Sequence, residues 1–320
     1  MPLLEIKNLK LDFLSGEARL RAVDDVSLSV EAGETVCLVG ESGCGKSVTA
    51  LSIARLLATP PAHYAGGQIL LEGRDVLQMS KRELRGIRGG VVSYVFQEPS
   101  ASLSPVWRVG RQIKEALKLH RPEKANDAEV IRLLKLVGMP APESRRKDYP
   151  FQMSGGMQQR VMIAMAVASE PRLLIADEPT TALDVTIQAQ ILELLRDLKR
   201  QFGMAILLIT HNLGIVGDMA DRVAVMYAGQ IVELAPARDL LRRPLHPYTA
   251  ALINSVPKLA GGARRLSAIP GTVPPPGAFP PGCRFYPRCP SRRPECAHTM
   301  PKLAETEPGR WVRCLYAAGS

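Results

Sequence analysis

The sequence contains no long apolar run and no cysteine pair at the spacing of a common metal motif. Its longest apolar stretches, such as the one in MAILLIT, are less than half the length that a membrane-spanning helix needs. The N-terminus, MPLLEIKNLKLDF, lacks the basic start and the long apolar core of a signal peptide. These absences argue against an integral membrane protein and a secreted one. We therefore expect a cytosolic protein, or one attached to a membrane through a partner.

The charge balance is strongly positive. There are 41 Lys and Arg residues against 31 Asp and Glu residues, which gives a formal net charge of +10 at pH 7. Such a charge favours acidic partners, namely nucleotides, anionic lipid headgroups or nucleic acid. Solubility alone is the simpler explanation, and the charge does not decide between them.

Strand patterns and helix patterns alternate over most of the chain. Strands are predicted first in LLEIKNLKL, VDDVSLSV and ETVCLVG, and later in RLLIADEP, MAILLITH and RVAVMYAG. Between about residues 100 and 165 the apolar spacing becomes helical, with Asn126 as a predicted N-cap. We predict an α/β fold whose mostly parallel sheet is covered by helices and interrupted by this helical subdomain. Beyond about residue 256 the composition shifts, so we predict a domain over 1–255 and a small, irregular, Cys-rich C-terminal extension over 256–320. The extension contains a Pro-rich stretch, IPGTVPPPGAFPPG, that should be extended.

A phosphate-binding pattern, G-x-x-x-x-G-K-[ST], is matched at every fixed position by GESGCGKS, between a predicted strand and a predicted helix. Its glycines let backbone N–H groups turn towards phosphates, Lys46 supplies a positive charge, and the Ser47 hydroxyl can bind Mg²⁺. The positive end of the following helix also favours anions. A chance Gly-rich turn is the weaker alternative. The predicted nucleotide-binding residues of this segment are Gly40, Glu41, Ser42, Gly43, Cys44, Gly45, Lys46, Ser47 and Val48.

An apolar strand that ends in two acids, LLIADE, is the second element. Asp177 is placed to hold Mg²⁺, and Glu178 is the candidate general base that polarises the attacking water. By itself this pattern could be the end of any buried strand. Together with the phosphate loop it predicts ATP hydrolysis.

Further motifs point to one family. The segment MSGGMQQR, just upstream of LLIADEP, resembles the signature sequence of ABC-type ATPases, with Met153 where Leu is usual. The Q-loop residue Gln97 lies in FQEP, the D-loop residue Asp184 in TALD and the switch residue His211 in ITHN, in the order of the family. The resemblance covers residues 1–250 and implies an ABC-type P-loop ATPase domain with a helical subdomain.

The resemblance also implies roles for these residues. Two ATPase domains would face each other, with ATP between the phosphate loop of one and the signature of the other. His211 would contact the γ-phosphate and act with Glu178 as a catalytic residue, and Gln97 would join Ser47 and Asp177 at Mg²⁺. Phe13 is the candidate for stacking on adenine, although it could equally be a core residue. The predicted partner-site residues are Ser154, Gly155, Gly156, Gln158 and Asp184.

The C-terminal part of the sequence, from about residue 242, restricts the resemblance to one group of ABC-type ATPases. The segments RRPLHPYTAALINSVP and IPGTVPPPGAFPPGCRFYPRCP are similar to the C-terminal extension of dipeptide and oligopeptide importer ATPases. This implies an ATP-hydrolysing subunit that powers peptide import from the cytoplasmic face of the cell membrane, as a peripheral protein. The implied partners are a second ABC ATPase in a heterodimer, two integral-membrane permease subunits and an extracytoplasmic solute-binding protein, without nucleic acid.

Three alternatives stay open. Importers of nickel and of other small solutes share the same tail. A soluble ABC protein whose basic tail binds nucleic acid through a zinc module belongs to another class. A non-hydrolysing regulatory subunit is the third, and the intact Lys46, Asp177, Glu178 and His211 argue against it.

Four of the six cysteines gather in the tail, at the spacing C-x5-C-x6-C-x17-C. In a reducing cytosol, clustered cysteines favour a metal site over disulfides. Zinc motifs prefer C-x2–4-C pairs and the bacterial ferredoxin run is C-x2-C-x2-C, and neither occurs here. Wide, Pro- and Arg-rich loops suit a larger object, so we predict a [4Fe–4S] cluster, with Zn²⁺ as the alternative and four unrelated free thiols as the third. The predicted ligands are Cys283, Cys289, Cys296 and Cys314.

Overall fold

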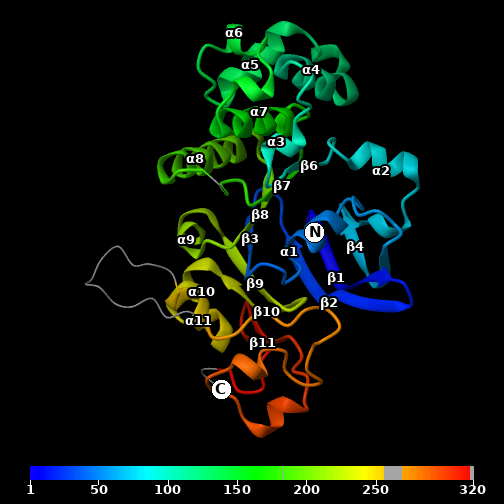
Figure 1. Cartoon of the computed structure of the whole chain (residues 1–320), viewed down its shortest axis with the longest axis vertical. Coiled ribbons are helices and arrows are strands. Elements are labelled where there is room, and N and C mark those ends of the chain that lie inside the picture. The colour runs from blue at the N-terminus through cyan, green and yellow to red at the C-terminus, as the bar shows by residue number, and fades with distance from the viewer. Residues whose placement is uncertain (182, 256–268, 318–320) are drawn as a thin grey trace. The chain divides into compact units, whose positions relative to one another are not determined.

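The computed structural model describes residues 1–181, 183–255 and 269–317 (Figure 1). Two compact units divide the chain, and each combines stretches that are distant in sequence. Unit 1 comprises Met1–Val30, Thr35–Gln78 and Ile209–Ser320, and unit 2 comprises Glu31–Glu34 and Met79–Leu208. Residues on both sides of the predicted boundary at 255/256 belong to unit 1, and residues 256–268 and 318–320 of the predicted extension lie outside the described residues. A separate domain over 256–320 stays a prediction.

Two sets of strands organise unit 1. One is an antiparallel sheet in the order β2-β1-β4-β5, and the other has the order β11-β12-β10-β9-β3, in which only β3 and β9 run parallel. The strands are β1 (Leu4–Ser15), β2 (Ala18–Val30), β3 (Thr35–Val39), β4 (Ala62–Leu71), β5 (Arg74–Asp75), β9 (Arg222–Tyr227), β10 (Gln230–Pro236), β11 (Ala304–Glu307) and β12 (Arg310–Val312).

The parallel strands are buried on both faces. All five residues of β3, TVCLV, are buried, which is why this strand appears in the sequence as a continuous apolar run without alternation. Cys37 lies in its middle, and burial raises the pKa of its thiol to about 12. Cys37 is therefore a buried thiol of the core.

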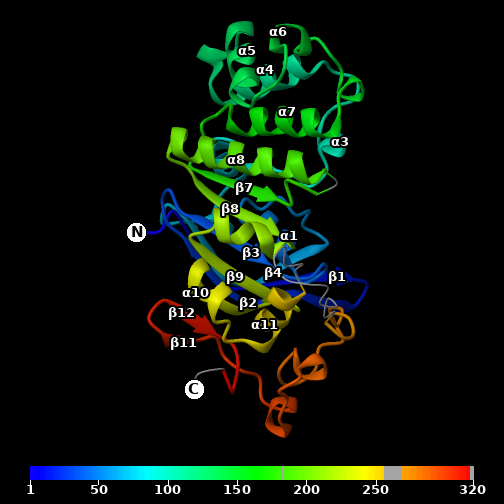
Figure 2. The ribbon, with the colours of Figure 1, turned by 90° about the vertical axis from the view of Figure 1, so that its left-hand side faces the viewer.

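The helices of unit 1 are short. In Figures 1 and 2, α10 lies against β9 and β10, which it contacts, and β11 and β12 lie near the C-terminal end. The helical segments are α1 (Lys46–Ser52), η1 (Val76–Gln78), η4 (Leu213–Ile215), α9 (Val216–Met219), α10 (Ala237–Arg242), α11 (Pro247–Asn254), η5 (Tyr286–Arg288) and η6 (Pro294–Ala297).

The C-terminal segment is more regular than its sequence predicts. Residues 269–282 contain no helix or strand, as the Pro-rich composition predicts. Strands β11 and β12, however, form an antiparallel pair, and β12 adds to β10 through Glu233–Val312 and Leu234–Trp311. The prediction of an irregular extension is thus wrong for these residues. A three-residue strand that depends on a partner distant in sequence leaves no periodicity to detect.

Unit 2 holds a parallel strand set and the helical region. Its strands follow the order β8-β7-β6, and β6 and β7 are parallel. Helices occupy the region from residue 99 to residue 167, where the apolar spacing of the sequence is helical, and a separate helical subdomain at about 100–165 stays a prediction. The elements are α2 (Lys81–Ile87), β6 (Val92–Val95), α3 (Pro99–Ser102), α4 (Val109–His120), η2 (Pro122–Lys124), α5 (Asp127–Leu136), α6 (Pro142–Arg145), η3 (Pro150–Gln152), α7 (Gly155–Val167), β7 (Leu173–Asp177), α8 (Val185–Phe202) and β8 (Ala205–Thr210).

Helices α5 and α8 of unit 2 begin at a side-chain cap, the first of them at the predicted N-cap Asn126. The Asn126 side chain accepts a hydrogen bond from the Glu129 N–H at 2.9 Å and begins α5. Asp184 accepts one from the Ile187 N–H at 2.9 Å and begins α8. Both satisfy N–H groups that a helix start leaves without an intrahelical acceptor.

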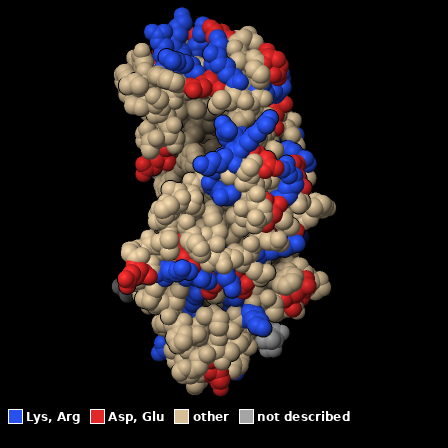
Figure 3. Space-filling model, turned by 90° about the vertical axis from the view of Figure 1, so that its right-hand side faces the viewer, with Lys and Arg blue, Asp and Glu red and all other residues tan. Residues whose placement is uncertain are grey.

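The surface and the helices carry two further observations. On the face drawn in Figure 3, Lys and Arg side chains lie in several groups with Asp and Glu beside them, so the positive charge is not gathered into one patch there. Among the helices that the structure describes, none has the length and apolar character needed to cross a membrane.

Candidate active site

The phosphate loop connects β3 to α1, as predicted. Gly45 is the N-cap of α1 with φ +106°, a conformation that residues with a side chain rarely adopt. A Cβ atom on Gly40 would lie 2.2 Å from the Met226 carbonyl oxygen. The backbone of β9 therefore passes so close to the loop that only glycine fits at Gly40.

Lys46 lies inside this loop. Its side chain is buried, and the Nζ atom donates hydrogen bonds to the carbonyl oxygens of Gly40 at 2.8 Å and Glu41 at 2.9 Å. Ser47 is exposed next to it, whereas Cys44 is buried, and burial raises the pKa of the Cys44 thiol. The loop thus presents an ammonium group and a hydroxyl, the two side chains that phosphate and Mg²⁺ binding requires.

Glu178 and Gln97 are brought together in unit 2. Asp177 ends β7 and Glu178 follows it at φ +47°, in the left-handed region that is uncommon for residues other than glycine. The Glu178 Oε2 atom accepts hydrogen bonds from the Gln97 side-chain amide at 3.1 Å and from the Thr181 hydroxyl at 2.9 Å. The candidate base is therefore held in one orientation by two donors.

Thr181 was missed by the sequence analysis. It follows Glu178 by three residues in DEPTTALD, and a Ser or Thr three residues after a candidate base is too frequent to be a signal. The neighbouring residue 182, in the predicted D-loop motif TALD, lies outside the described residues.

The signature and the D-loop helix also lie together in unit 2. The exposed Ser154 is the N-cap of α7, and its hydroxyl accepts a hydrogen bond from the Met157 N–H at 3.4 Å. A Cβ atom on Gly156 would lie 3.0 Å from the Ile187 side chain, so α7 and α8 approach closely at this point. Gln158 donates instead to the Pro150 and Met153 carbonyl oxygens, which fixes the turn before α7.

His211 and Phe13 belong to unit 1 with the phosphate loop. His211 is exposed directly after β8. Phe13 lies in β1, opposite Leu20 of β2, and is only partly buried. The loop, His211 and Phe13 are therefore in one unit, and Gln97, Asp177, Glu178, the signature and Asp184 are in the other. Their roles towards nucleotide and Mg²⁺ stay predictions.

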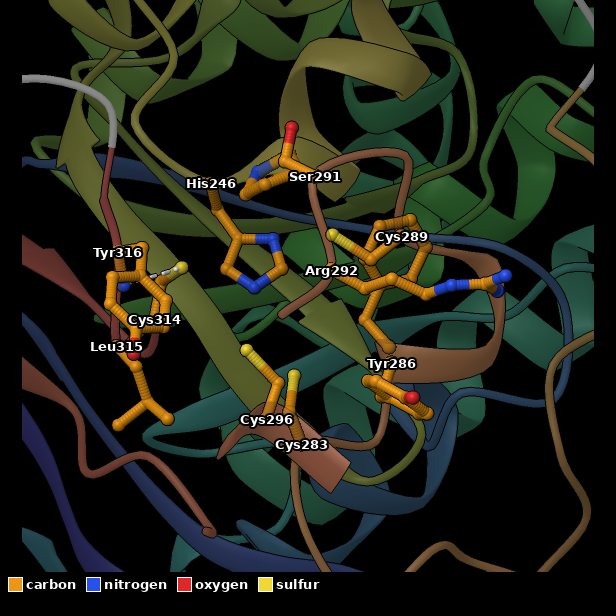
Figure 4. A pocket seen from close by; sticks show the side chains of 12 residues that line it. His246, Cys283, Tyr286, Cys289, Ser291, Arg292, Cys296, Cys314, Leu315 and Tyr316 are labelled. Atoms are coloured by element: carbon orange, nitrogen blue, oxygen red, sulfur yellow. Dashed lines mark hydrogen bonds between the residues drawn. The ribbon is translucent and has the colours of Figure 1, made fainter. Parts of the chain in front are cut away.

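The four tail cysteines line one pocket of unit 1. Figure 4 shows their sulfur atoms facing a common space that is also lined by His246, Tyr286 and Tyr316. Burial raises the pKa of Cys283 to about 11 and also raises the pKa values of Cys289 and Cys314. The fold thus brings together the four cysteines that the sequence predicts as ligands.

The predicted metal site is not confirmed. In the part of the chain that the structure describes, no group of three or more His, Cys, Asp and Glu side chains is arranged to hold a metal ion. Sequence spacing alone could not show this, because the separation of the thiols depends on how the loops fold. A zinc ion has no support in the structure, and neither does the zinc module of the nucleic-acid-binding alternative.

His246 has a structural role beside this pocket. It is fully buried, and its Nδ1 atom accepts a hydrogen bond from the Tyr248 N–H at 3.0 Å at the start of α11. Burial lowers the pKa of His246 to about 3, so the ring is neutral at physiological pH. The His-Pro-Tyr trio, His246 to Tyr248, is therefore a helix start, with Pro247 at a position where its missing N–H has no consequence.

Comparisons with known proteins agree with this geometry. The family model described as "ABC transporter" matches residues 23–181, and the one described as "Oligopeptide/dipeptide transporter, C-terminal region" matches residues 232–296. The oligopeptide transport ATP-binding protein AppD of Bacillus subtilis is 50% identical over 98% of this chain and 96% of its own length. The chain belongs to the ABC transporter family. Its C-terminal region belongs to the oligopeptide/dipeptide transporter group of that family.

Two further relatives and a solved structure extend the comparison. A probable peptide ABC transporter ATP-binding protein of Sinorhizobium fredii, y4tR, is 51% identical over 98% of this chain and 94% of its own length. The dipeptide transport ATP-binding protein DppD of Bacillus subtilis is 47% identical over 97% of this chain and 93% of its own length. The ATP-binding cassette MJ0796, solved as a dimer in a post-hydrolysis state with ADP and Pi, is 27% identical, with a TM-score of 0.65, over 73% of this chain and 99% of its own. This ABC transporter subunit is therefore an ATPase with the ABC-type P-loop fold.

Proposed function

We propose that this ABC ATPase powers the import of dipeptides or oligopeptides through separate membrane permease subunits. One observation carries the proposal: the chain is 50% identical in sequence to the oligopeptide transport ATP-binding protein AppD. The alignment covers 98% of the chain and therefore includes most of the C-terminal segment. The family match of the C-terminal region supports the same proposal. This match is needed because the hydrolytic motifs are shared by ABC proteins whatever solute they transport.

The hydrolytic step follows from the residues already described. ATP is the substrate, and Mg²⁺, when bound, would balance the charge that develops on its phosphates. Ser47, Gln97 and Asp177 supply a hydroxyl, an amide and a carboxylate, and these oxygen donors fit Mg²⁺. Lys46 would pair with the β- and γ-phosphates, while Gln97 and Thr181 keep the Glu178 carboxylate turned to accept a proton from water. His211 would contact the γ-phosphate.

The proposed assembly has a second ATPase subunit, as a heterodimer, and two integral-membrane permeases at the cytoplasmic face of the membrane. An extracytoplasmic binding protein would deliver the solute. The exposed Ser154 and Gly155 at the start of α7 support a signature that touches nucleotide on the second subunit. ATP can drive transport only by binding one arrangement of the assembly more tightly than the other.

The test uses the chain reconstituted in vesicles with its permeases and binding protein. Glu178→Gln should lower ATP hydrolysis by a factor of about 100 or more, because it removes the base but keeps the side-chain shape. ATP binding should persist, and uptake of a labelled dipeptide should stop. Glu193→Gln, at an exposed glutamate of α8, is the matched control. It should leave ATP hydrolysis and dipeptide uptake unchanged. Uptake of nickel but not of peptide by the unaltered assembly would contradict the peptide assignment.

We further propose that the cysteine pocket holds a [4Fe–4S] cluster. Four thiols that line one space support it, since a cluster of this kind is held by four cysteine thiolates. The group would be held by Cys283, Cys289, Cys296 and Cys314, and it would not take part in hydrolysis. Anaerobically purified chain should contain iron and sulfide and absorb visible light, and Cys296→Ser should reduce both. A colourless protein without iron would contradict the proposal.

A further inference from the structure

The C-terminal segment reaches the phosphate loop through Arg288. This residue lies in η5, directly before Cys289 of the cysteine pocket. Its guanidinium group donates to both carboxylate oxygens of Glu41, from Nη1 to Oε2 at 2.7 Å and from Nη2 to Oε1 at 2.9 Å. Glu41 is the second residue of the phosphate loop, so a residue 247 positions later in the chain binds inside the nucleotide-binding motif.

The guanidinium group is fixed by more than this pair. Its Nε atom donates to the Pro270 carbonyl oxygen at 2.8 Å and its Nη1 atom to the Tyr227 hydroxyl at 3.5 Å. The Arg288 side chain is only 5% exposed, whereas that of Glu41 is 29% exposed. The hydrogen bond to Glu41 is the main reason why the pKa of Arg288 is raised. A two-pronged pair of this kind sets both charge and orientation.

Glu41 is anchored at three points. Its N–H donates to the Tyr248 hydroxyl at 3.0 Å, its carbonyl oxygen accepts from Lys46 Nζ at 2.9 Å, and its carboxylate binds Arg288. Tyr248 belongs to the His-Pro-Tyr trio and is fully buried. Two residues beyond the hydrolytic motifs therefore define the first turn of the phosphate loop.

The negative charge of Glu41 explains why its ion pair with Arg288 affects nucleotide binding. A carboxylate in a loop that binds a polyphosphate repels the nucleotide, and it competes for the ammonium group of Lys46. Because the pair is mostly withdrawn from water, this repulsion is poorly screened. Pairing with Arg288 compensates the charge of the carboxylate, and the Lys46 Nζ atom contacts the Glu41 carbonyl oxygen.

We propose that Arg288 is a positioning residue for ATP binding, which neutralises Glu41 and holds the first turn of the phosphate loop in its binding conformation. The C-terminal segment is then part of the nucleotide site as well as a mark of the transporter family. Arg288 acts through Glu41 and not on the phosphates themselves, so its removal should affect the affinity for ATP more than the rate of the hydrolytic step.

The test measures binding of a fluorescent ATP analogue to the purified full chain. Arg288→Met should weaken binding about tenfold, because an unpaired carboxylate then lies beside the phosphates. The double variant Glu41→Gln/Arg288→Met should restore the affinity to within about threefold of the unaltered chain, since neither charge remains. The matched control is Arg293→Met, at an exposed arginine that stacks on Tyr316, and its affinity should not change. In hydrolysis assays Arg288→Met should raise KM about tenfold and change kcat less than twofold.

Three results would overturn the proposal. The first is that Arg288→Met binds ATP as tightly as the unaltered chain does. The second is that the double variant binds ATP as weakly as Arg288→Met, which would mean that Arg288 only keeps the C-terminal segment folded. If Arg288→Met does not fold, as judged by circular dichroism, Glu41→Gln alone decides: binding at least as tight as in the unaltered chain supports charge compensation, and weaker binding contradicts it.

Discussion

The phosphate loop and the cysteine pocket lie in the same unit, yet they are built in opposite ways. The loop is eight consecutive residues with glycines where β9 passes within contact distance, and side chains from outside it, those of Tyr248 and Arg288, contact only its first turn. The pocket draws its cysteines from a stretch of 32 residues between 283 and 314 and is held by side chains: the Arg284 guanidinium donates to the Ala228 carbonyl oxygen, and Arg313 donates to the Ile231 carbonyl oxygen at 3.0 Å. A site made of consecutive residues can be found as a motif, whereas for dispersed side chains the sequence names only candidates and the fold decides whether they meet.

We therefore expect a single added atom in the phosphate loop to disturb both folding and ATP binding. Gly40→Ala should lower the free energy of unfolding by about 3 kcal/mol or more and abolish ATP binding, because its Cβ atom would lie 2.2 Å from the Met226 carbonyl oxygen. Gly43→Ala is the matched control: it also has a positive φ, but its Cβ atom would meet nothing within 4 Å. We expect it to cost about 1 kcal/mol. Urea denaturation and ATP titration of both variants measure the difference, and equal effects would show that the close approach to β9 is unimportant.

The cysteine pocket should instead depend on its core packing. Phe285 is 1% exposed, with ring centroids 5.2 Å from Tyr227 and 5.3 Å from Tyr248. Phe285→Ala should lower the free energy of unfolding by about 3 kcal/mol, since it leaves a cavity between the pocket and the residues that hold the phosphate loop. Its neighbour Tyr286 is only partly buried, and Tyr286→Ala should lower it by about 1 kcal/mol. A Phe285→Ala chain that unfolds like the unaltered one would show that the C-terminal segment is a loose appendage.

The smallest expected effect is a pH dependence at His246. The unfolded chain takes up a proton near the ordinary histidine pKa of about 6.5, whereas burial lowers the pKa of folded His246 to about 3. The unfolded state thus binds more protons in this window, so stability is full above about pH 6.5 and falls as the pH drops towards 3. Between pH 7 and pH 5 the expected loss from this residue is about 2 kcal/mol.

The variant His246→Asn isolates that contribution. Its side-chain oxygen can still accept the Tyr248 N–H at the helix start, but it does not titrate. The drop in stability from pH 7 to pH 5, measured by urea denaturation, should be about 2 kcal/mol smaller than in the unaltered chain. His63→Asn, at an exposed histidine, should not change the drop. An unaltered drop in His246→Asn would mean that folding does not lower the pKa of His246.

Much of the fold and most of the candidate site were predictable. The phosphate loop, LLIADE, the signature and both helix caps each depend on neighbours within about one turn or one strand, so their residues carry the information themselves. The strands and the helical region followed from periodicity for the same reason. Family membership came from the order of these motifs along the chain.

Other features were decided by tertiary structure. The contact of Gln97 with Glu178 joins residues 81 positions apart and needs β6 and β7 side by side. The pairing of β12 with β10 places Val312 opposite Glu233, which is 79 residues away by subtraction. In the sequence, Arg288 was one positive charge among many in an Arg-rich tail. Only the fold shows that it binds Glu41, because an ion pair between residues so distant in sequence depends on every element packed between them.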